Sequence, residues 1–287
     1  MFRSEAEGKI QSPPFRKLLK RRRFTINNMK NLQKTGTYLE EKVKVYRNIS
    51  IIFFAIGGII LIIDGIVLIY SFISINFGLS YSFYLLPISI FSIFILGIGG
   101  FFFQKYLNYN GGLEAEKLVI EHLKNLDDKY YLINDVNLPN GYGNIDHIIL
   151  GPNGIFVIET KNFEGEIICN GDEWIRHYKG GLKISMKGRP YYQEDRDYEI
   201  KSPSKQIKGN ALKLKHYIES KNVFSKSLRI WVEGIVVFTH DNVILRLDNP
   251  NVPVLKVNQL CNYIRNKESR IKFSSQELEK IAKILLR

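Results

Sequence analysis

The stretch GNIDHIILGPNGIFVIETKN, residues 143–162, predicts a tight β-hairpin at the centre of a sheet. Its turn, residues 151–154, has proline and asparagine at the two central positions of a type I turn. Apolar side chains occupy both faces of both strands, which is typical of strands that are covered on each side. Each strand nevertheless carries one acid, Asp146 or Glu159, and Lys161 follows the second acid. The hairpin therefore places charged side chains among residues that are otherwise typical of a hydrophobic core.

The spacing around the turn predicts which of these charged side chains lie together. A two-residue loop and a four-residue loop give the same register, in which Asp146 faces Glu159. Directly opposed side chains have Cβ atoms about 4.5–5.5 Å apart. The two carboxylates would therefore repel each other unless one is protonated or a cation lies between them. Lys161 is two residues beyond Glu159, so we expect it on the same face of the strand.

A third acid is predicted to join this pair. The segment Leu113–Leu126 has the apolar spacing of a helix, and Glu116 falls inside its apolar stripe, where an acid is unexpected. We therefore expect Glu116 to point into the domain, towards Asp146 and Glu159.

Three carboxylates in one place favour a hard divalent cation, Mg²⁺ or Mn²⁺. A lysine beside such an ion suggests phosphate chemistry. The metal would polarise a phosphoryl oxygen, and Lys161 would position a water molecule or stabilise the pentavalent charge. From the residues alone, the alternative is a buried structural salt bridge between Lys161 and one of the acids.

These motifs carry a family resemblance: residues 112–240 resemble the NERD (nuclease-related) domain, a branch of the PD-(D/E)XK nuclease-like fold. GLEAEKLV, residues 112–119, is similar to its opening helix motif, although Ala115 stands where that motif usually has glycine. The hairpin resembles the core of the family, with Glu159, Thr160 and Lys161 as the E-x-K motif. Residues 202–218, SPSKQIKGNALKLKHYI, resemble the downstream helix with its glutamine at Gln206, and VEGIVVFTHD resembles the later core strand.

The resemblance implies an α/β fold, a restriction-endonuclease-like mixed sheet flanked by helices, and hydrolysis of phosphodiester bonds in DNA or RNA. It implies a metal held by three acids and one backbone carbonyl, namely those of Glu116, Asp146, Glu159 and Thr160. Lys161 would support the attacking water, and Gln206 would orient a water molecule or touch the phosphate. Catalysis is inferred for many domains of this branch, so a membrane-tethered nucleic-acid-binding module without turnover stays open as an alternative. A membrane scaffold whose N-terminal basic residues bind anionic lipid is the other alternative.

The remaining pattern predicts a nuclease-like domain over residues 113–266 and a C-terminal helix over residues 267–287. Residues 194–199, EDRDYE, are expected to form a polar loop. On the helix at 204–220, basic side chains predict a surface that could follow a nucleic-acid backbone, formed by Lys205, Lys208 and Lys213. His147 is expected on the sheet face opposite Asp146, in a packing role.

Two apolar segments precede this domain, at residues 49–70 and 83–103, and each is long enough to cross a hydrocarbon core of ~30 Å as a helix. We predict a transmembrane hairpin over residues 49–103 and a linker over 104–112. Basic residues flank both segments, which places both termini and the nuclease-like domain in the cytoplasm. The one charge within the spans, Asp64, is expected to be a hydrogen-bonded packing residue or to lie at a shallow depth.

Residues 1–48 are predicted to form a basic cytoplasmic arm. The arm has 13 basic and 4 acidic residues, whereas the whole chain has a net charge of +13. Its stretch FRKLLKRRRF could contact anionic lipid or nucleic acid, or could only set the membrane orientation. The two cysteines have no paired spacing, which excludes a disulfide scaffold and fits a reducing compartment.

Overall fold

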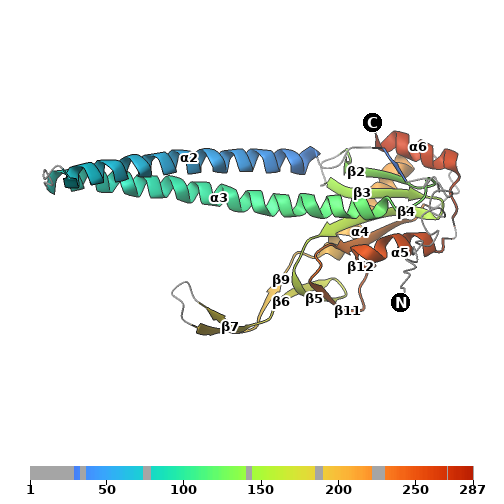
Figure 1. Cartoon of the computed structure of the whole chain (residues 1–287). Coiled ribbons are helices and arrows are strands. Elements are labelled where there is room, and N and C mark those ends of the chain that lie inside the picture. Colours follow the sequence, from blue (N-terminus) through green and yellow to red (C-terminus); the bar gives the residue numbers. More distant parts are fainter. Residues whose placement is uncertain are drawn as a thin grey trace, which may run out of the picture.

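The computed structural model describes residues 29–32, 37–73, 79–139, 144–184, 190–221, 230–269 and 271–286. The stretch FRKLLKRRRF of the predicted basic arm lies outside these residues. The chain consists of an α/β domain from which a pair of long helices projects (Figure 1). This arrangement confirms the predicted order of two apolar helices followed by a mixed α/β domain.

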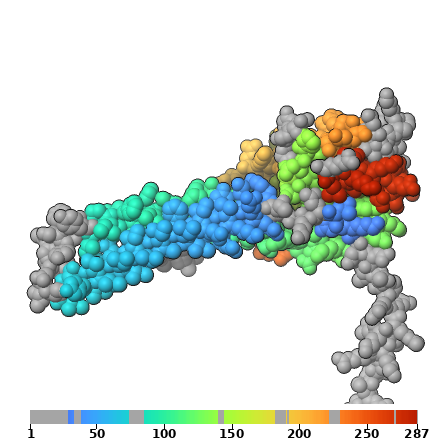
Figure 2. All heavy atoms as spheres, turned by 90° about the horizontal axis from the view of Figure 1, so that it is seen from above, coloured from blue at the N-terminus to red at the C-terminus, as the bar shows by residue number. Residues whose placement is uncertain are grey.

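The projecting pair consists of α2 (Thr37–Ile73) and α3 (Leu79–Leu123), which lie against each other along their length (Figures 1 and 2). Each helix contains a stretch that is long and apolar enough to cross a membrane, within Tyr38–Ile73 and within Leu85–Leu123. Most of the apolar side chains in these stretches face outward rather than into the protein. Such a surface is typical of helices that are surrounded by lipid.

Small and polar residues line the seam between the two helices. In the described part of α2, the buried positions recur at every seventh residue: Val43, Ser50, Gly57, Asp64 and Ser71. A seven-residue period keeps one stripe of a helix in continuous contact with a partner helix. Polar groups are paired across this seam, because Ser92 donates a hydrogen bond to the Gly57 carbonyl at 2.6 Å and Ser89 donates to Asp64. Asp64 is thus a hydrogen-bonded packing residue, as one of the two expectations stated.

The expected linker at residues 104–112 is helical instead. α3 continues without a break from its apolar stretch through these residues to Leu123. The glycines at 111 and 112 do not break the helix: Gly111 lies close to Asn162 of the domain and Gly112 close to Leu39 of α2. The apolar helix and the helix that carries Glu116 are therefore one rigid element.

The main sheet is mixed, as predicted, and has six strands in the order β1-β2-β3-β4-β10-β12. β3 is antiparallel to both of its neighbours, β2 and β4, whereas β4, β10 and β12 run parallel, and β1 runs parallel to β2. The strands are β1 (Lys30–Asn31), β2 (Tyr131–Asn137), β3 (Asn144–Gly151), β4 (Gly154–Lys161), β10 (Val232–Phe238) and β12 (Val254–Lys256).

Helices cover both faces of this sheet. The end of α3 packs on one face together with α5 (Leu260–Asn266), which follows the 3₁₀ turn Val257–Gln259. The opposite face packs against α4 (Pro203–Ser220) and α6 (Ser275–Leu285). α6 thus shares the core of the domain, so the expected boundary between residues 266 and 267 does not separate two folding units.

β1 changes the interpretation of the N-terminal segment. Residues 29–32, expected within the basic arm, form an edge strand whose backbone bonds Leu126, Tyr130 and Leu132, and Figure 2 shows this blue segment on the domain. The chain therefore leaves the domain after β1, runs out along α2 and returns along α3. The start of α2 and the end of α3 therefore lie on the same side of the apolar stretches.

A second sheet, not expected from the sequence, has the order β11-β5-β6-β9, and a two-stranded sheet of β7 and β8 extends it. Its strands are β5 (Gly165–Asn170), β6 (Glu173–Tyr178), β9 (Arg196–Glu199) and β11 (Val243–Asp248), with β7 (Gly181–Ile184) and β8 (Pro190–Gln193) beyond. β9 replaces most of the polar loop expected at 194–199. We call β6 to β9 the β-ribbon; it extends from the domain on the same side as α2 and α3 (Figure 1).

Candidate active site

The hairpin has the predicted register. Gly151 pairs with Gly154, and the ladder continues to the pair of His147 and Ile158. Beyond this point the ladder stops, so Asp146 does not pair backbone to backbone with Glu159. Instead, the Asp146 carboxylate accepts a hydrogen bond from the Thr160 amide at 2.9 Å. The Asp146 side chain thus takes the place of a backbone hydrogen-bond partner, and the hairpin is open at this end of the sheet.

Glu159 and Lys161 lie on the face of β4 that packs against α4. Lys161 Nζ lies 2.6 Å from Glu159 Oε1 and 3.4 Å from Gln206 Oε1. Gln206 is in the second turn of α4, a helix that begins with Pro203 and is capped by the Ser202 side chain. The structure therefore brings together Glu159, Lys161 and Gln206, three residues from two elements that are distant in sequence.

Glu116 approaches the same place from the opposite face of the sheet. The pKa of Glu116 is raised from 4.5 to about 7, first by burial and then by the negative charges of Asp135 and Glu159. The acid is thus in an environment where its charge is not compensated. The charge of Glu159, on one face of the sheet, therefore acts on a carboxyl group that comes from the opposite layer.

Asp146 and Glu159 are affected in the same way. Burial and the charge of Glu159 raise the pKa of Asp146 well above its ordinary value, although the Thr160 amide opposes this. Burial also raises the pKa of Glu159, while Lys161 and Gln206 lower it. One lysine is therefore not sufficient to balance the three acids, and this excess of negative charge favours a second cation.

One acid of this group was missed by sequence analysis. Asp135 in β2 has a positive φ of 55°, a conformation that costs energy for a residue other than glycine. Its carboxylate accepts hydrogen bonds from the Tyr38 amide, at 3.4 Å, and from the Asn144 side chain. Asp135 thus ties the start of α2 to the acidic end of the sheet. An acid within the buried run YYLINDVN was the signal that could have found it.

A second missed residue is Lys201, an exposed residue just before α4. Its positive charge contributes to lowering the pKa of Glu159. Lys161 and Lys201 are therefore the two cations that act on this acid. An anionic substrate would meet both of them at the open end of the sheet.

The donor set fits a hard cation in its chemistry, but the side chains are not arranged as a finished metal site. Among the described residues, no three His, Cys, Asp or Glu side chains are grouped closely enough to hold one ion. Glu159 Oε2, however, is buried without a hydrogen-bond partner. A buried carboxylate oxygen without a partner is costly, and a divalent cation would satisfy it.

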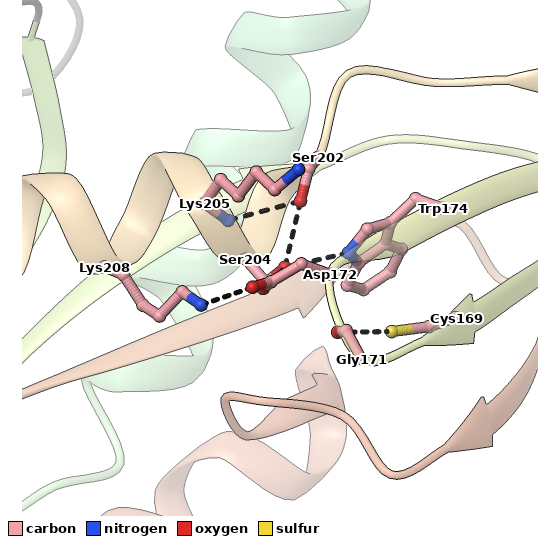
Figure 3. A network of polar contacts seen from close by, with 8 residues as sticks. All are labelled: Cys169, Gly171, Asp172, Trp174, Ser202, Ser204, Lys205 and Lys208. Atoms are coloured by element: carbon pink, nitrogen blue, oxygen red, sulfur yellow. Dashed lines mark hydrogen bonds and ion pairs between the residues drawn. The ribbon is translucent and has the colours of Figure 1, made fainter.

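The three basic residues predicted to contact nucleic acid all lie on α4 but differ in their surroundings. Lys205 is exposed near the start of α4, whereas Lys213 lies on the helix stripe that also contains Gln206. Lys208 lies 2.5 Å from Asp172, which also accepts a hydrogen bond from Ser204 (Figure 3). Lys208 therefore fastens α4 to the turn between β5 and β6.

His147 occupies the packing position that sequence analysis expected. It is fully buried, and its ring nitrogen Nδ1 lies 2.8 Å from the Asn134 side chain. Burial lowers the pKa of His147 to about 3, so its ring is neutral at pH 7. Its position excludes a role in the acidic cluster.

The raised pKa of Glu116 predicts how the stability of the metal-free protein depends on pH. In the unfolded chain Glu116 titrates near 4.5, but in the folded chain near 7. Between these values the folded state binds the additional proton, so the free energy of unfolding falls as the pH rises from 4.5 to 7. We expect a change on the order of 1–3 kcal/mol. Denaturant unfolding in chelator across this range measures it.

Glu116→Gln should remove most of this dependence, because glutamine has no proton to lose. Glu114→Gln is the matched control, since Glu114 is an exposed acid of the same helix that lies 3.6 Å from Lys117. An equal pH dependence in the Glu116→Gln variant and the unsubstituted chain would show that Glu116 is not held protonated by the fold.

Comparison with known proteins agrees with this geometry. A family model described as the nuclease-related domain (NERD) matches residues 111–239. An uncharacterized protein of Bacillus anthracis is 40% identical over 88 residues, which cover 29% of this chain and 41% of that protein. The match thus spans about two fifths of the length of this curated relative. No solved structure matches the chain significantly.

Proposed function

Because residues 111–239 form a nuclease-related domain, we propose that the chain hydrolyses phosphodiester bonds in DNA or RNA with the help of Mg²⁺ or Mn²⁺. One observation carries this proposal: Asp146, Glu159 and Lys161 meet at the open end of the hairpin, where acids outnumber the lysine that pairs with them. A purely structural salt bridge would need one acid for one lysine. The additional acids suit a metal ion that is bound together with a phosphate.

We assign a separate role to each residue of the site. Glu116, Asp146, Glu159 and the Thr160 carbonyl would hold the metal, which supplies a Lewis acid for the phosphoryl oxygen and lowers the pKa of a bound water. In a β-strand, the amide and the carbonyl of one residue point to the same side, and this applies to Thr160. Since its amide bonds Asp146, the carbonyl is directed towards the same side of β4.

Lys161 is the group that acts on the water and on the developing negative charge. Its ammonium is held between Glu159 and Gln206, so its position is fixed before substrate binds. A preformed cation next to the reacting phosphate stabilises the transition state without reorganisation. Gln206 keeps Lys161 in place and offers an amide to water or phosphate.

We also propose that α2 and α3 cross a membrane as a hairpin and that the domain lies in the cytoplasm. The apolar stretches support this, as does the return of the chain to the same domain on both sides of the pair. Lys42, Lys44 and Arg47 precede the first apolar stretch and Lys105 follows the second, which agrees with the positive-inside tendency. The basic stretch FRKLLKRRRF remains a proposed contact for anionic lipid head groups, on its sequence alone.

The test is a cleavage assay with the full chain in detergent or nanodiscs. Fluorescently labelled single- and double-stranded DNA and RNA are incubated with Mg²⁺, Mn²⁺ or chelator, and products are resolved by length. We expect cleavage with either metal, none in chelator, and none in an Asp146→Asn variant. Cleavage that continues in chelator, or that is unchanged in Asp146→Asn, would overturn the proposal.

A second function is favoured by the ion pair of Glu159 and Lys161, in which the lysine neutralises one acid of the site. A chain that binds nucleic acid but does not cut it would keep this pair. Such a protein would bind the labelled strands in the same assay and release no product with either metal.

A further inference from the structure

The β-ribbon has two faces of different chemistry. In the antiparallel pair of β6 and β9, Arg176 is opposite Tyr198 and Tyr178 is opposite Arg196. Side chains alternate between the faces of a strand, so these four share one face. The other face of the same two strands carries His177, Asp197 and Glu199, with Ile175. Arginine and tyrosine are thus sorted to one side, and acids to the other.

The side chains of the first face stack on one another. The Arg176 guanidinium lies over the Tyr178 ring at 4.5 Å and near the Phe163 ring at 5.6 Å. The rings of Tyr178 and Tyr198 meet edge to face at 5.3 Å. Tyr178 and Tyr198 remain 41% and 46% exposed. Flat aromatic surface beside a cation is therefore available to a ligand.

This row of side chains begins at the candidate active site. Phe163 follows Lys161 by two residues and packs near Phe238, the last residue of β10. Further in on the same face of β6, Trp174 stacks on Phe238 within the core. From Phe163 the row leads outward over Arg176 to Tyr178 and Tyr198.

The base of the β-ribbon is fixed relative to the site. Trp174 Nε1 donates to Ser204 Oγ at 3.0 Å, and Ser204 donates to Asp172 at 2.5 Å (Figure 3). Lys208 of α4 bonds the same carboxylate. Because α4 also carries Gln206, the row of aromatic side chains and the catalytic lysine are held by one connected network.

We propose that Phe163, Arg176, Tyr178, Arg196 and Tyr198 form a stacking face for the unpaired bases of a single-stranded nucleic acid that leads to the active site. This inference rests on the proposed function for its ligand class. Base stacking on aromatic rings and on arginine accepts any base. The arginines also neutralise phosphates, whereas the acids of the opposite face repel them. A duplex conceals its base planes, so single strands are favoured.

The test measures binding in chelator, where no cleavage occurs, by fluorescence anisotropy with the full chain in detergent. The probes are a labelled single strand, its duplex, and a strand of equal length without bases. We expect Tyr178→Ala with Tyr198→Ala to weaken single-strand binding about 10-fold or more, since each lost ring removes a surface on which a base stacks. Binding of the strand without bases should change less than twofold.

Three further variants separate stacking from folding and charge. Tyr178→Phe with Tyr198→Phe keeps the rings and should bind as the unsubstituted chain does. Arg176→Lys keeps the charge but loses the planar group, so single-strand binding should weaken without a change in its salt dependence. Trp231→Ala removes an exposed aromatic at the opposite end of β10 and should have no effect.

The outcomes distinguish this inference from the proposed function. Equal loss of the strand with and without bases, or no loss in the double alanine variant, would overturn the stacking face. A chain that binds neither strand nor duplex would also overturn it. Base-dependent binding through this face in a chain that never cleaves would support the stacking face while refuting the nuclease proposal.

Discussion

Lys161→Ala should lower the rate of metal-dependent cleavage by about 10²–10⁴-fold, the usual contribution of a positioned proton-transfer or charge-stabilising group. The substitution removes the cation that lies 2.6 Å from Glu159, and with it the group that would meet the attacking water. It also removes the charge that lowers the pKa of Glu159. The remaining activity should therefore need a higher pH. Single-turnover rates across the pH range with saturating Mg²⁺ measure both effects.

Lys205→Ala is the matched control for this loss of charge. Lys205 is an exposed lysine in the first turn of α4, close in sequence to Gln206 but outside the ion pair of Lys161 with Glu159. Its removal should weaken substrate binding modestly and leave the single-turnover rate at saturation almost unchanged. If Lys161→Ala reduced binding alone, with an unchanged rate at saturation, Lys161 would be a phosphate anchor rather than a catalytic group.

Trp174→Ala should destabilise the domain by about 3–5 kcal/mol, the range for deleting a large buried aromatic. Trp174 is only 1% exposed, stacks on Phe238 at a centroid distance of 6.0 Å, and donates to Ser204. Alanine leaves a cavity and leaves Ser204 without this donor. Guanidinium unfolding followed by circular dichroism reports the change in the free energy of unfolding.

Trp231 provides the matched control, because it is the other tryptophan of the chain and is 70% exposed. Trp231→Ala should change the stability by less than about 0.5 kcal/mol, as exposed substitutions usually do. Fluorescence of the remaining tryptophan then identifies which environment is lost first. Similar losses for both variants would mean that the second sheet is not packed on Phe238 as described.

The hairpin at the centre of the fold could be predicted because its information is local. The turn at residues 151–154 sets the register, and the alternation of apolar residues sets the faces. The prediction failed one pair beyond the ladder, at Asp146, where a carboxylate takes the place of a backbone partner. Rules for strand pairing consider only backbone hydrogen bonds. They therefore do not predict a side chain that competes with the backbone for a hydrogen bond.

The elements that sequence analysis missed depend on distant partners. β1 has two residues, too few for any periodic signal, and exists because β2 offers a free edge. β9 consists of three charged residues and Tyr198, and it pairs with a strand that is distant in sequence, as in the pair of His177 and Asp197. The helical continuation through residues 104–112 outweighs two glycines, because α2 packs along α3 and stabilises the helix from outside.

The unbroken course of α3 has a consequence for where substrate can be reached. Glu116 lies thirteen residues after Phe103 in the same helix, a rise of roughly 20 Å. If α2 and α3 span a membrane as proposed, α3 would hold the carboxylates at a constant height above the bilayer. No flexible segment would then allow them to move towards the membrane or away from it. A nucleic-acid strand would therefore be cleaved only where it reaches this height above the membrane. One inserted residue would turn the domain by about 100° about the helix axis, away from the direction in which the domain faces now.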